Sequence, residues 1–245
     1  MTEPAWFENW FDSDYYHLLY QNRDEKEAEA FVSRLMQNLD LPKGKRALDL
    51  ACGKGRHSIF LNSLGYEVVG VDLSSNSIQL ARKHARPGLS FKVGDMRLPQ
   101  GNEDFDLIVN LFTSFGYFSS ESENLQTLSA MFQALKPGGL LAIDFMNTTK
   151  VLEHLVPENR IERNGIVFDI RKRLENRRIM KEIRFSDQGK DWFFEERVQA
   201  LTEADFRSAF LKTGFEVVLL WGNYQLEPYH PLLSDRMIFI VRKPG

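Results

Sequence analysis

The sequence is poor in cysteine and has no long apolar run. Cys52 is the only cysteine among 245 residues, which excludes an intramolecular disulfide and a thiol cluster for structural zinc. No segment reaches the ~18 apolar residues of a membrane-spanning helix. The N-terminal segment MTEPAWFENWFDSDYY carries acids and aromatics where a signal peptide has basic and apolar residues. We therefore expect a protein without membrane partners that works in a reducing cytoplasm.

A strong charge imbalance is also missing. The net charge is −3 and the pI is about 6, so neither nucleic acid nor an anionic membrane is the expected partner. Residues 171–184 are a local exception, with seven basic residues against two acidic ones. Over 158–200 the counts are eleven and nine, which favours a solvated strand face over an RNA-binding surface.

Apolar runs alternate with helical segments in the first part of the chain. A capping box and an apolar stripe predict a helix over 24–39. The runs that predict strands are 47–51, 67–72, 89–93, 105–110 and 140–145. The helical segments between them are 55–64, from 74 or 75 to 86, and 121–136. This alternation predicts an α/β fold with a parallel sheet covered on both faces.

The pattern changes after Asn147. Three strand-like runs within 161–200 predict a three-stranded antiparallel insertion. A helix opened by Thr202 and two final strands follow. We therefore divide the chain into an N-terminal helical flap (1–40), a main domain (41–147 and 201–245) and an antiparallel β lid (148–200).

The segment ALDLACGKGRHSIF, residues 47–60, joins a strand to a helix through a glycine turn. Gly53 and Gly55 allow a ligand to approach the backbone at the start of the helix. The dinucleotide pattern G-x-G-x-x-G fails, because Ser58 occupies the position of its third glycine. Asp49 would repel phosphates but suits a positive amino group. Together these residues favour S-adenosylmethionine, which carries an ammonium, over a pyrophosphate.

These residues resemble the first motif of the class I S-adenosylmethionine-dependent methyltransferases, with Ala51 standing where many members have glycine. Asp72 resembles the acid that holds the ribose hydroxyls, although an N-cap for the next helix is the alternative. Gly94-Asp95-Met96 is similar to the adenine-side motif, and Asn110-Leu111-Phe112 to the methionine-side segment. LKPGG at 135–139 is a further family landmark.

The resemblance implies a Rossmann-like, doubly wound seven-stranded sheet, mostly parallel with the last strand antiparallel. Cys52 is interpreted as a packed residue whose backbone N–H is useful to the ligand. In related small-molecule methyltransferases, an N-terminal segment of the YYHLLY type supplies a tyrosine near the carboxylate of the cofactor. The resemblance implies this role for Tyr20. The implied cofactor-binding residues are Tyr20, Asp49, Ala51, Cys52, Gly53, Gly55, Asp72, Leu73, Asp95, Met96, Asn110, Leu111 and Phe112.

The insertion resembles the lid of amino-sugar and glycine-type N-methyltransferases, which covers a small substrate or forms a homodimer contact. Phe115, Tyr117 and Phe118 follow a sheet strand and are candidate substrate walls, with packing under the lid as the equal alternative. His57 is interpreted as a local packing or capping residue. Asp144 and Asn147 resemble metal ligands of catechol-type enzymes, but Asn110 replaces the first acid, so no metal is expected.

The resemblance predicts methyl transfer to nitrogen or oxygen of a small molecule by in-line displacement. No catalytic base is assigned. The alternatives are a non-catalytic cofactor-binding or RNA-binding module, an RNA-methylating one, and a nicotinamide-dependent dehydrogenase.

Overall fold

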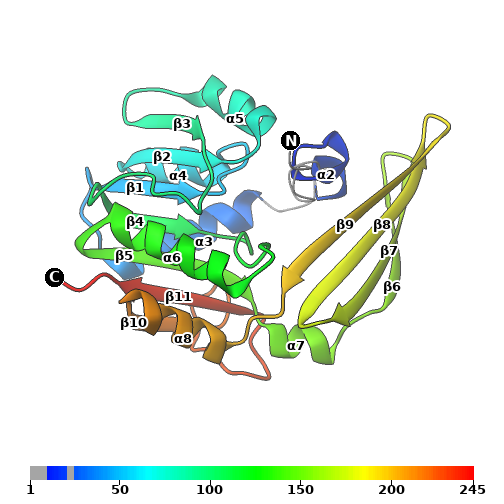
Figure 1. The fold of residues 1–245 in the computed structure, drawn as a ribbon. Coiled ribbons are helices and arrows are strands. Elements are labelled where there is room, and N and C mark those ends of the chain that lie inside the picture. Colours follow the sequence, from blue (N-terminus) through cyan, green and yellow to red (C-terminus); the bar gives the residue numbers. More distant parts are fainter. Residues whose placement is uncertain (1–9, 21–24) are drawn as a thin grey trace.

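Two β-sheets organise the computed structural model, which describes residues 10–20 and 25–245 (Figure 1). The main sheet has seven strands in the order β10-β11-β5-β4-β1-β2-β3. Its strands are β1 (Arg46–Leu50), β2 (Glu67–Asp72), β3 (Leu89–Val93), β4 (Phe105–Asn110), β5 (Leu135–Met146), β10 (Glu216–Trp221) and β11 (Arg236–Arg242). Neighbours from β3 to β5 pair in parallel, and β11 is antiparallel to β5 and to β10. The predicted fold class is confirmed.

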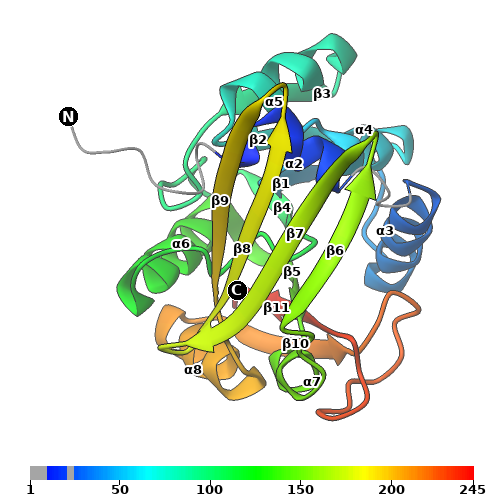
Figure 2. The ribbon, with the colours of Figure 1, turned by 90° about the vertical axis from the view of Figure 1, so that its right-hand side faces the viewer.

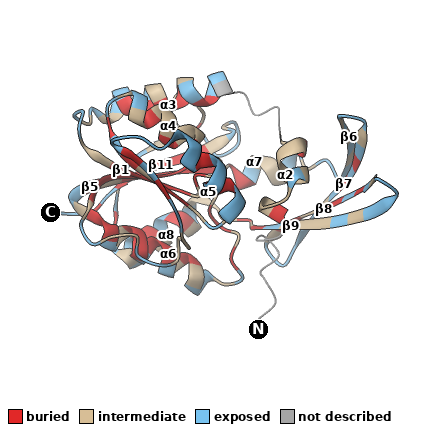
Figure 3. Cartoon of the chain, turned by 90° about the horizontal axis from the view of Figure 1, so that it is seen from above, coloured by how far each residue is buried: buried red, intermediate tan, exposed pale blue. Residues whose placement is uncertain are grey.

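Helices cover both faces of the main sheet (Figure 3). The helices on one face are α3 (Glu25–Leu39), α4 (Arg56–Ser63) and α5 (Ser75–Ala81), which a 3-10 turn continues over Arg82–His84. The helices on the other face are α6 (Glu121–Ala134) and α8 (Glu203–Thr213). Phe31 and Leu61 pack from the first group, and Leu128 and Phe206 from the second. The inner strands β1, β4 and β11 are buried over most of their length, as continuous apolar runs predict, whereas the edge strands β3 and β10 are partly exposed.

Helix α6 ends two residues before the predicted boundary. Leu135 already has extended backbone angles, and β5 begins there. Lys136 and Pro137 therefore belong to the strand. At the N-terminus of α8, Thr202 and Asp205 form a capping box.

The insertion has four strands where three were predicted. They are β6 (Glu158–Arg163), β7 (Ile166–Glu175), β8 (Arg178–Asp187) and β9 (Lys190–Gln199), antiparallel in this order, and we call them the lid sheet. Strand β6 escaped prediction because its sequence ENRIER contains one apolar residue, Ile161. The turn Asn164-Gly165, with both φ angles positive, is the hairpin signal that could have revealed it. The short helix α7 (Thr148–Glu153), which leads into the lid sheet, was also not predicted.

The segment 10–20, which contains α2 (Asp14–Leu19), lies between the main sheet and the lid sheet (Figures 1 and 2). Trp10 and Leu19 pack against Phe168 and Ile183 of the lid. Helix α3, in contrast, packs against the main sheet. The segment grouped as a flap, 1–40, therefore divides between the two sheets, and 1–9 and 21–24 lie outside the described residues.

The basic stretch 171–184 is largely compensated within the lid sheet. Arg173 forms ion pairs with Glu175, Glu182 and Glu195. Arg184 also pairs with Glu182. These pairs are typical of a solvated strand face rather than of a surface left free for phosphates. None of the described helices has the length and apolar composition needed to cross a membrane.

Candidate functional site

A cavity of about 850 Å³ lies at the carboxyl ends of the parallel strands, and we call it the main cavity. The segments at the carboxyl ends of β1, β2, β3 and β4 line it, with Ala51–Lys54, Asp72–Ser75, Gly94–Met96 and Leu111–Ser114. Phe11, Tyr16 and Tyr20 line it from the N-terminal segment. Open α/β sheets bind ligands at this edge.

The loop after β1 has three residues with left-handed backbone, at Ala51, Gly53 and Gly55 (φ 61°, 54° and 84°). A Cβ atom on Gly55 would lie 2.6 Å from Phe91 Cε1, so this position requires glycine. Ala51, Cys52 and Gly53 line the main cavity. The backbone N–H of Cys52 donates to Val71 O at 3.1 Å, so the interpretation that this N–H serves a ligand is wrong. Burial raises the pKa of the Cys52 thiol, which fits a packed side chain.

Asp49 lies behind the loop and not in the main cavity. Its carboxylate is 1% exposed and accepts a hydrogen bond of 2.6 Å from Ser58 Oγ. Asp49 is absent from the lining of the main cavity, so the prediction that it contacts an ammonium directly needs correction. Its role in the structure is to fix α4 to β1. Burial raises the pKa of Asp49 to about 7.

The raised pKa of Asp49 predicts that stability falls as pH rises towards 7. The folded protein binds the extra proton between the usual pKa of 3.8 and the folded value of about 7. The contribution of this extra proton to the free energy of unfolding is therefore complete below the unfolded pKa of 3.8. It is lost by up to ~1.4 kcal/mol per pH unit as the pH rises from there to about 7. Asp49→Asn removes the titration and keeps an oxygen for Ser58. Urea unfolding between pH 5 and 7.5 should show a smaller loss in D49N than in wild type, and equal losses would contradict this.

Asp72 lines the main cavity and also holds its walls together. Its two carboxylate oxygens accept hydrogen bonds from the backbone N–H groups of Gly53 and Ser74, each at 2.8 Å. Ser74, not Asp72, is the N-cap of α5. Burial is the largest cause of the raised pKa of Asp72. Asp72 and the neighbouring Leu73 both line this cavity.

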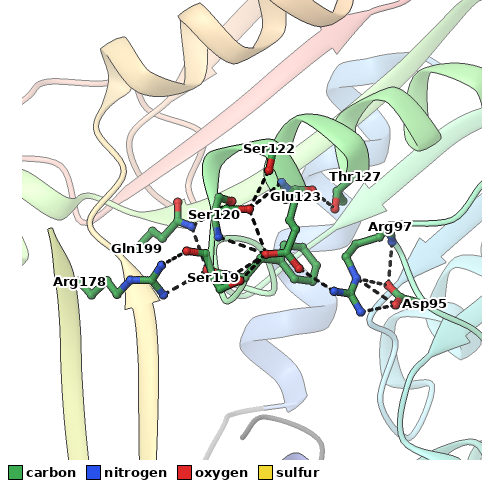
Figure 4. A network of polar contacts seen from close by, with 10 residues as sticks. Asp95, Arg97, Ser119, Ser120, Ser122, Glu123, Thr127, Arg178 and Gln199 are labelled. Atoms are coloured by element: carbon green, nitrogen blue, oxygen red, sulfur yellow. Dashed lines mark hydrogen bonds and ion pairs between the residues drawn. The ribbon is translucent and has the colours of Figure 1, made fainter. Parts of the chain in front are cut away.

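Asp95 and Met96, which follow β3, also line the main cavity. Arg97 pairs with Asp95 at 2.6 Å and with Glu123 at 2.7 Å. Figure 4 shows how this network continues through Ser119 to Arg178 of the lid sheet. The hydroxyl of Ser119 is the largest cause that lowers the pKa of Glu123 to about 2. The Asp95 loop and the lid are thus connected by charged hydrogen bonds.

The corner after β4 is built on a buried ion pair that sequence reasoning missed. Asp144 is fully buried and accepts hydrogen bonds from Arg236 Nε at 2.7 Å, Phe112 N at 2.8 Å and Tyr224 Oη at 3.1 Å. Phe112 and Thr113 both have left-handed backbone (φ 59° and 60°). Asp144 and Arg236 hold these two residues in a conformation that is otherwise disfavoured. An acid inside the apolar strand β5 is the signal that could have indicated this.

Asn110 does not reach the main cavity. It is fully buried, and its Nδ2 donates to Leu50 O at 3.0 Å. The prediction that it contacts the cofactor is corrected accordingly. Leu111 and Phe112 do line the cavity. His57 also lines the cavity. Its ring stacks on Phe112 with ring centroids 4.9 Å apart, so it has a packing contact, as interpreted from the sequence, as well as a face on the cavity.

A second cavity of about 600 Å³ lies between α7 and the lid sheet, and we call it the lid cavity. It shares Tyr20, Phe112, Thr113 and Tyr117 with the main cavity. The hydroxyl of Tyr20 donates to Glu196 Oε1 of the lid at 2.6 Å. Burial, the largest cause, raises the pKa of Tyr20. The two cavities are therefore neighbours that meet at these four residues.

The three candidate substrate walls have different positions. Tyr117 lines both cavities, and Phe118 lines the main cavity only. Phe115 is 1% exposed and packs on Phe206 with ring centroids 5.8 Å apart. Phe115 belongs to the core, so its assignment as a wall is corrected.

In the described part of the chain, no three His, Cys, Asp or Glu side chains gather as a metal-ligand set.

Comparison with known proteins agrees with this geometry. Residues 47–139 match a family described as methyltransferase domain. The putative methyltransferase YqeM of Bacillus subtilis is 35% identical over 116 residues, which cover 46% of this chain and 47% of that protein. The chain thus spans about half the length of this relative.

Two further similarities extend over nearly the whole chain. A dTDP-3-amino-3,4,6-trideoxy-alpha-D-glucopyranose N,N-dimethyltransferase of Streptomyces venezuelae is 26% identical over 225 residues, 86% of this chain and 92% of that protein. The fold matches the crystal structure of an S-adenosylmethionine-dependent methyltransferase from Clostridium acetobutylicum with a TM-score of 0.79, 20% identity, and coverage of 94% and 96% of the two chains. Residues 47–139 thus match a methyltransferase domain, and the whole chain shares the fold of this S-adenosylmethionine-dependent methyltransferase.

Proposed function

We propose that the main cavity binds S-adenosylmethionine and that the methyl group passes to an amine nitrogen of a small molecule in the lid cavity. The observation that carries this proposal is the meeting of the two cavities at Tyr20, Phe112, Thr113 and Tyr117. A sulfonium at this junction would face an acceptor directly. In-line displacement requires this arrangement of nucleophile, methyl carbon and sulfur.

The residues around the main cavity fit the cofactor. Its volume lies within the usual range for small-molecule sites. Asp72 would hold the ribose hydroxyls, Asp95 and Met96 would flank the adenine, and Leu111 and Phe112 would face the methionine side. The other proposed cofactor-binding residues are Tyr20, Ala51, Cys52, Gly53 and Leu73. Gly55 and Asp49 would act by shaping the loop. When bound, the cofactor supplies an already activated methyl group.

An amine acceptor is supported by the relative from Streptomyces venezuelae, whose name states N,N-dimethyl transfer. It is also supported by the engagement of Glu196, a carboxylate of the lid cavity that contacts the junction residue Tyr20. Glu196 Oε1 accepts from Tyr20 Oη and from Trp10 Nε1 at 2.7 Å. An amine that arrives unprotonated needs no base, whereas a hydroxyl does. Tyr117 and Phe118 would then position the acceptor and exclude water.

A homodimer through the lid and a cytoplasmic location also stay proposals. Phe193, which is 51% exposed on the outer face of the lid sheet, gives an apolar contact for a second copy. The buried free thiol of Cys52 is compatible with a reducing compartment. Sedimentation of the purified protein tests the dimer.

A transfer assay tests the function. The protein is incubated with methyl-labelled S-adenosylmethionine and matched panels of small amines and alcohols, and products are read by mass spectrometry. The proposal expects label on nitrogen and formation of S-adenosylhomocysteine. Transfer to oxygen only would contradict the amine assignment, and absence of S-adenosylhomocysteine binding would contradict the cofactor site.

Asp72→Ala is expected to weaken S-adenosylhomocysteine binding by about 1 to 3 kcal/mol, because the ribose hydroxyls lose their acceptor. Isothermal titration calorimetry measures the change. Glu67→Ala is the matched control, since it removes an exposed acid at the other end of the same strand and should leave affinity unchanged. Unchanged affinity in D72A would remove the ribose assignment.

A further inference from the structure

A row of charged residues crosses the inner face of the lid sheet between two apolar rows. Lys172 pairs in register with Lys181, and Lys181 pairs with Glu196. On one side of this row lie Ile170, Ile183 and Phe194, which are also in register. On the other side lie Leu174, Ile179 and Val198. All three charged residues line the lid cavity.

The charges of the row do not cancel. Lys181 lies 3.6 Å from Glu196 Oε2 and contacts the hydroxyl of Tyr20. Lys172 is half-buried, and its ammonium has no ion pair or hydrogen bond with the residues that the structure describes. Two like charges directly opposite each other in a sheet are destabilising. The arrangement therefore fits an anion that neutralises Lys172 when it is bound.

The other cations of the lid cavity already have carboxylate partners. Lys150 pairs with Asp235 at 2.6 Å. Arg236 pairs with Asp144 at 2.7 Å. Lys172 is thus the uncompensated cation among the described lysines and arginines of this cavity.

We propose that Lys172, supported by Lys181, binds an anionic group of the methyl acceptor, a phosphate or a carboxylate. This inference rests on the proposed function, because it specifies the acceptor of the same site. The reacting nitrogen would lie at Tyr20, where the cavities meet, and the anionic group would lie towards Lys172. The strands that carry Lys172 and Glu196 are two sheet spacings apart, about 10 Å. The acceptor therefore carries its anionic group at a distance from the methylated nitrogen.

The test titrates inorganic phosphate and acetate into protein saturated with S-adenosylhomocysteine, with affinities read from NMR chemical shifts. Saturation blocks the main cavity. Lys172→Gln should weaken binding of the preferred anion about tenfold, since one charged hydrogen-bond donor is lost. Lys172→Arg should retain binding. Arg171→Gln is the matched control, because it removes the same charge from the same strand on the opposite face, where Arg171 pairs with Glu158.

A preference for phosphate or for acetate identifies the source of the anionic group, and either supports the inference. Equal weakening in K172Q and R171Q would overturn it, because the effect would then be general charge screening. Absence of anion binding in protein that binds S-adenosylhomocysteine would overturn it too and leave the proposed function intact. Failure to bind S-adenosylhomocysteine would instead contradict the proposed function.

Discussion

Asp144→Ala is expected to lower the free energy of unfolding by about 3 to 5 kcal/mol, because it leaves Arg236 buried without its counter-charge. The Asp144 side chain is 0% exposed and that of Arg236 is 18% exposed. The change also removes the acceptor for Phe112 N and Tyr224 Oη. The corner where both cavities meet should therefore relax, and methyl transfer should fall more than the loss of folded protein explains. Urea unfolding and the transfer assay measure the two effects.

The matched control is the double variant Asp144→Leu with Arg236→Met. Replacing both members of a buried pair by apolar residues is often close to neutral for stability. The double variant should therefore recover most of the stability lost in D144A and remain poor in transfer, because Phe112 N still has no acceptor. A loss of less than about 1 kcal/mol in D144A would contradict the role given to this pair.

Gly55→Ala is expected to lower the free energy of unfolding by about 2 to 5 kcal/mol, the sum of left-handed strain and overpacking. The added Cβ would lie 2.6 Å from Phe91 Cε1 and 3.3 Å from Ala81 Cβ. Phe91 is buried and cannot turn into solvent. Movement of the loop would disturb Gly53 and Asp72, so affinity for S-adenosylhomocysteine should fall as well.

Gly53→Ala separates strain from collision. Gly53 also has positive φ, but a Cβ there meets no atom within 4 Å. G53A should therefore cost only the strain of about 1 to 2 kcal/mol. Urea unfolding of both variants checks this order. Equal stability of the two would show that the contact with Phe91 relaxes at little cost.

The sequence was sufficient to predict the elements whose signal is local. The apolar strands, the glycine turn after β1 and the carboxyl-end position of Asp72, Asp95 and Leu111 follow from periodicity, spacing and the family resemblance. Strand β6 could not be recognised by alternation, because it has one apolar residue. Its pairing depends on β7, across the Asn164-Gly165 turn.

The rest of the site depends on contacts between residues far apart in the chain. Asp49 and Asp144 are both acids inside apolar strands, and the sequence does not reveal that each is satisfied behind the cavity, by Ser58 and by Arg236. Phe115 and Tyr117 are two residues apart, yet only Tyr117 lines a cavity. Which side of a loop faces the core is decided by the helix packed against it, here α8 through Phe206.

A crystal structure with S-adenosylhomocysteine is the most direct test of the two-cavity site. The ribose should contact Asp72, the adenine should lie beside Asp95 and Met96, and the sulfur should face the junction of Tyr20 and Tyr117 with the lid cavity. A ligand bound elsewhere, or a sulfur that points away from the lid cavity, would contradict methyl transfer across this junction.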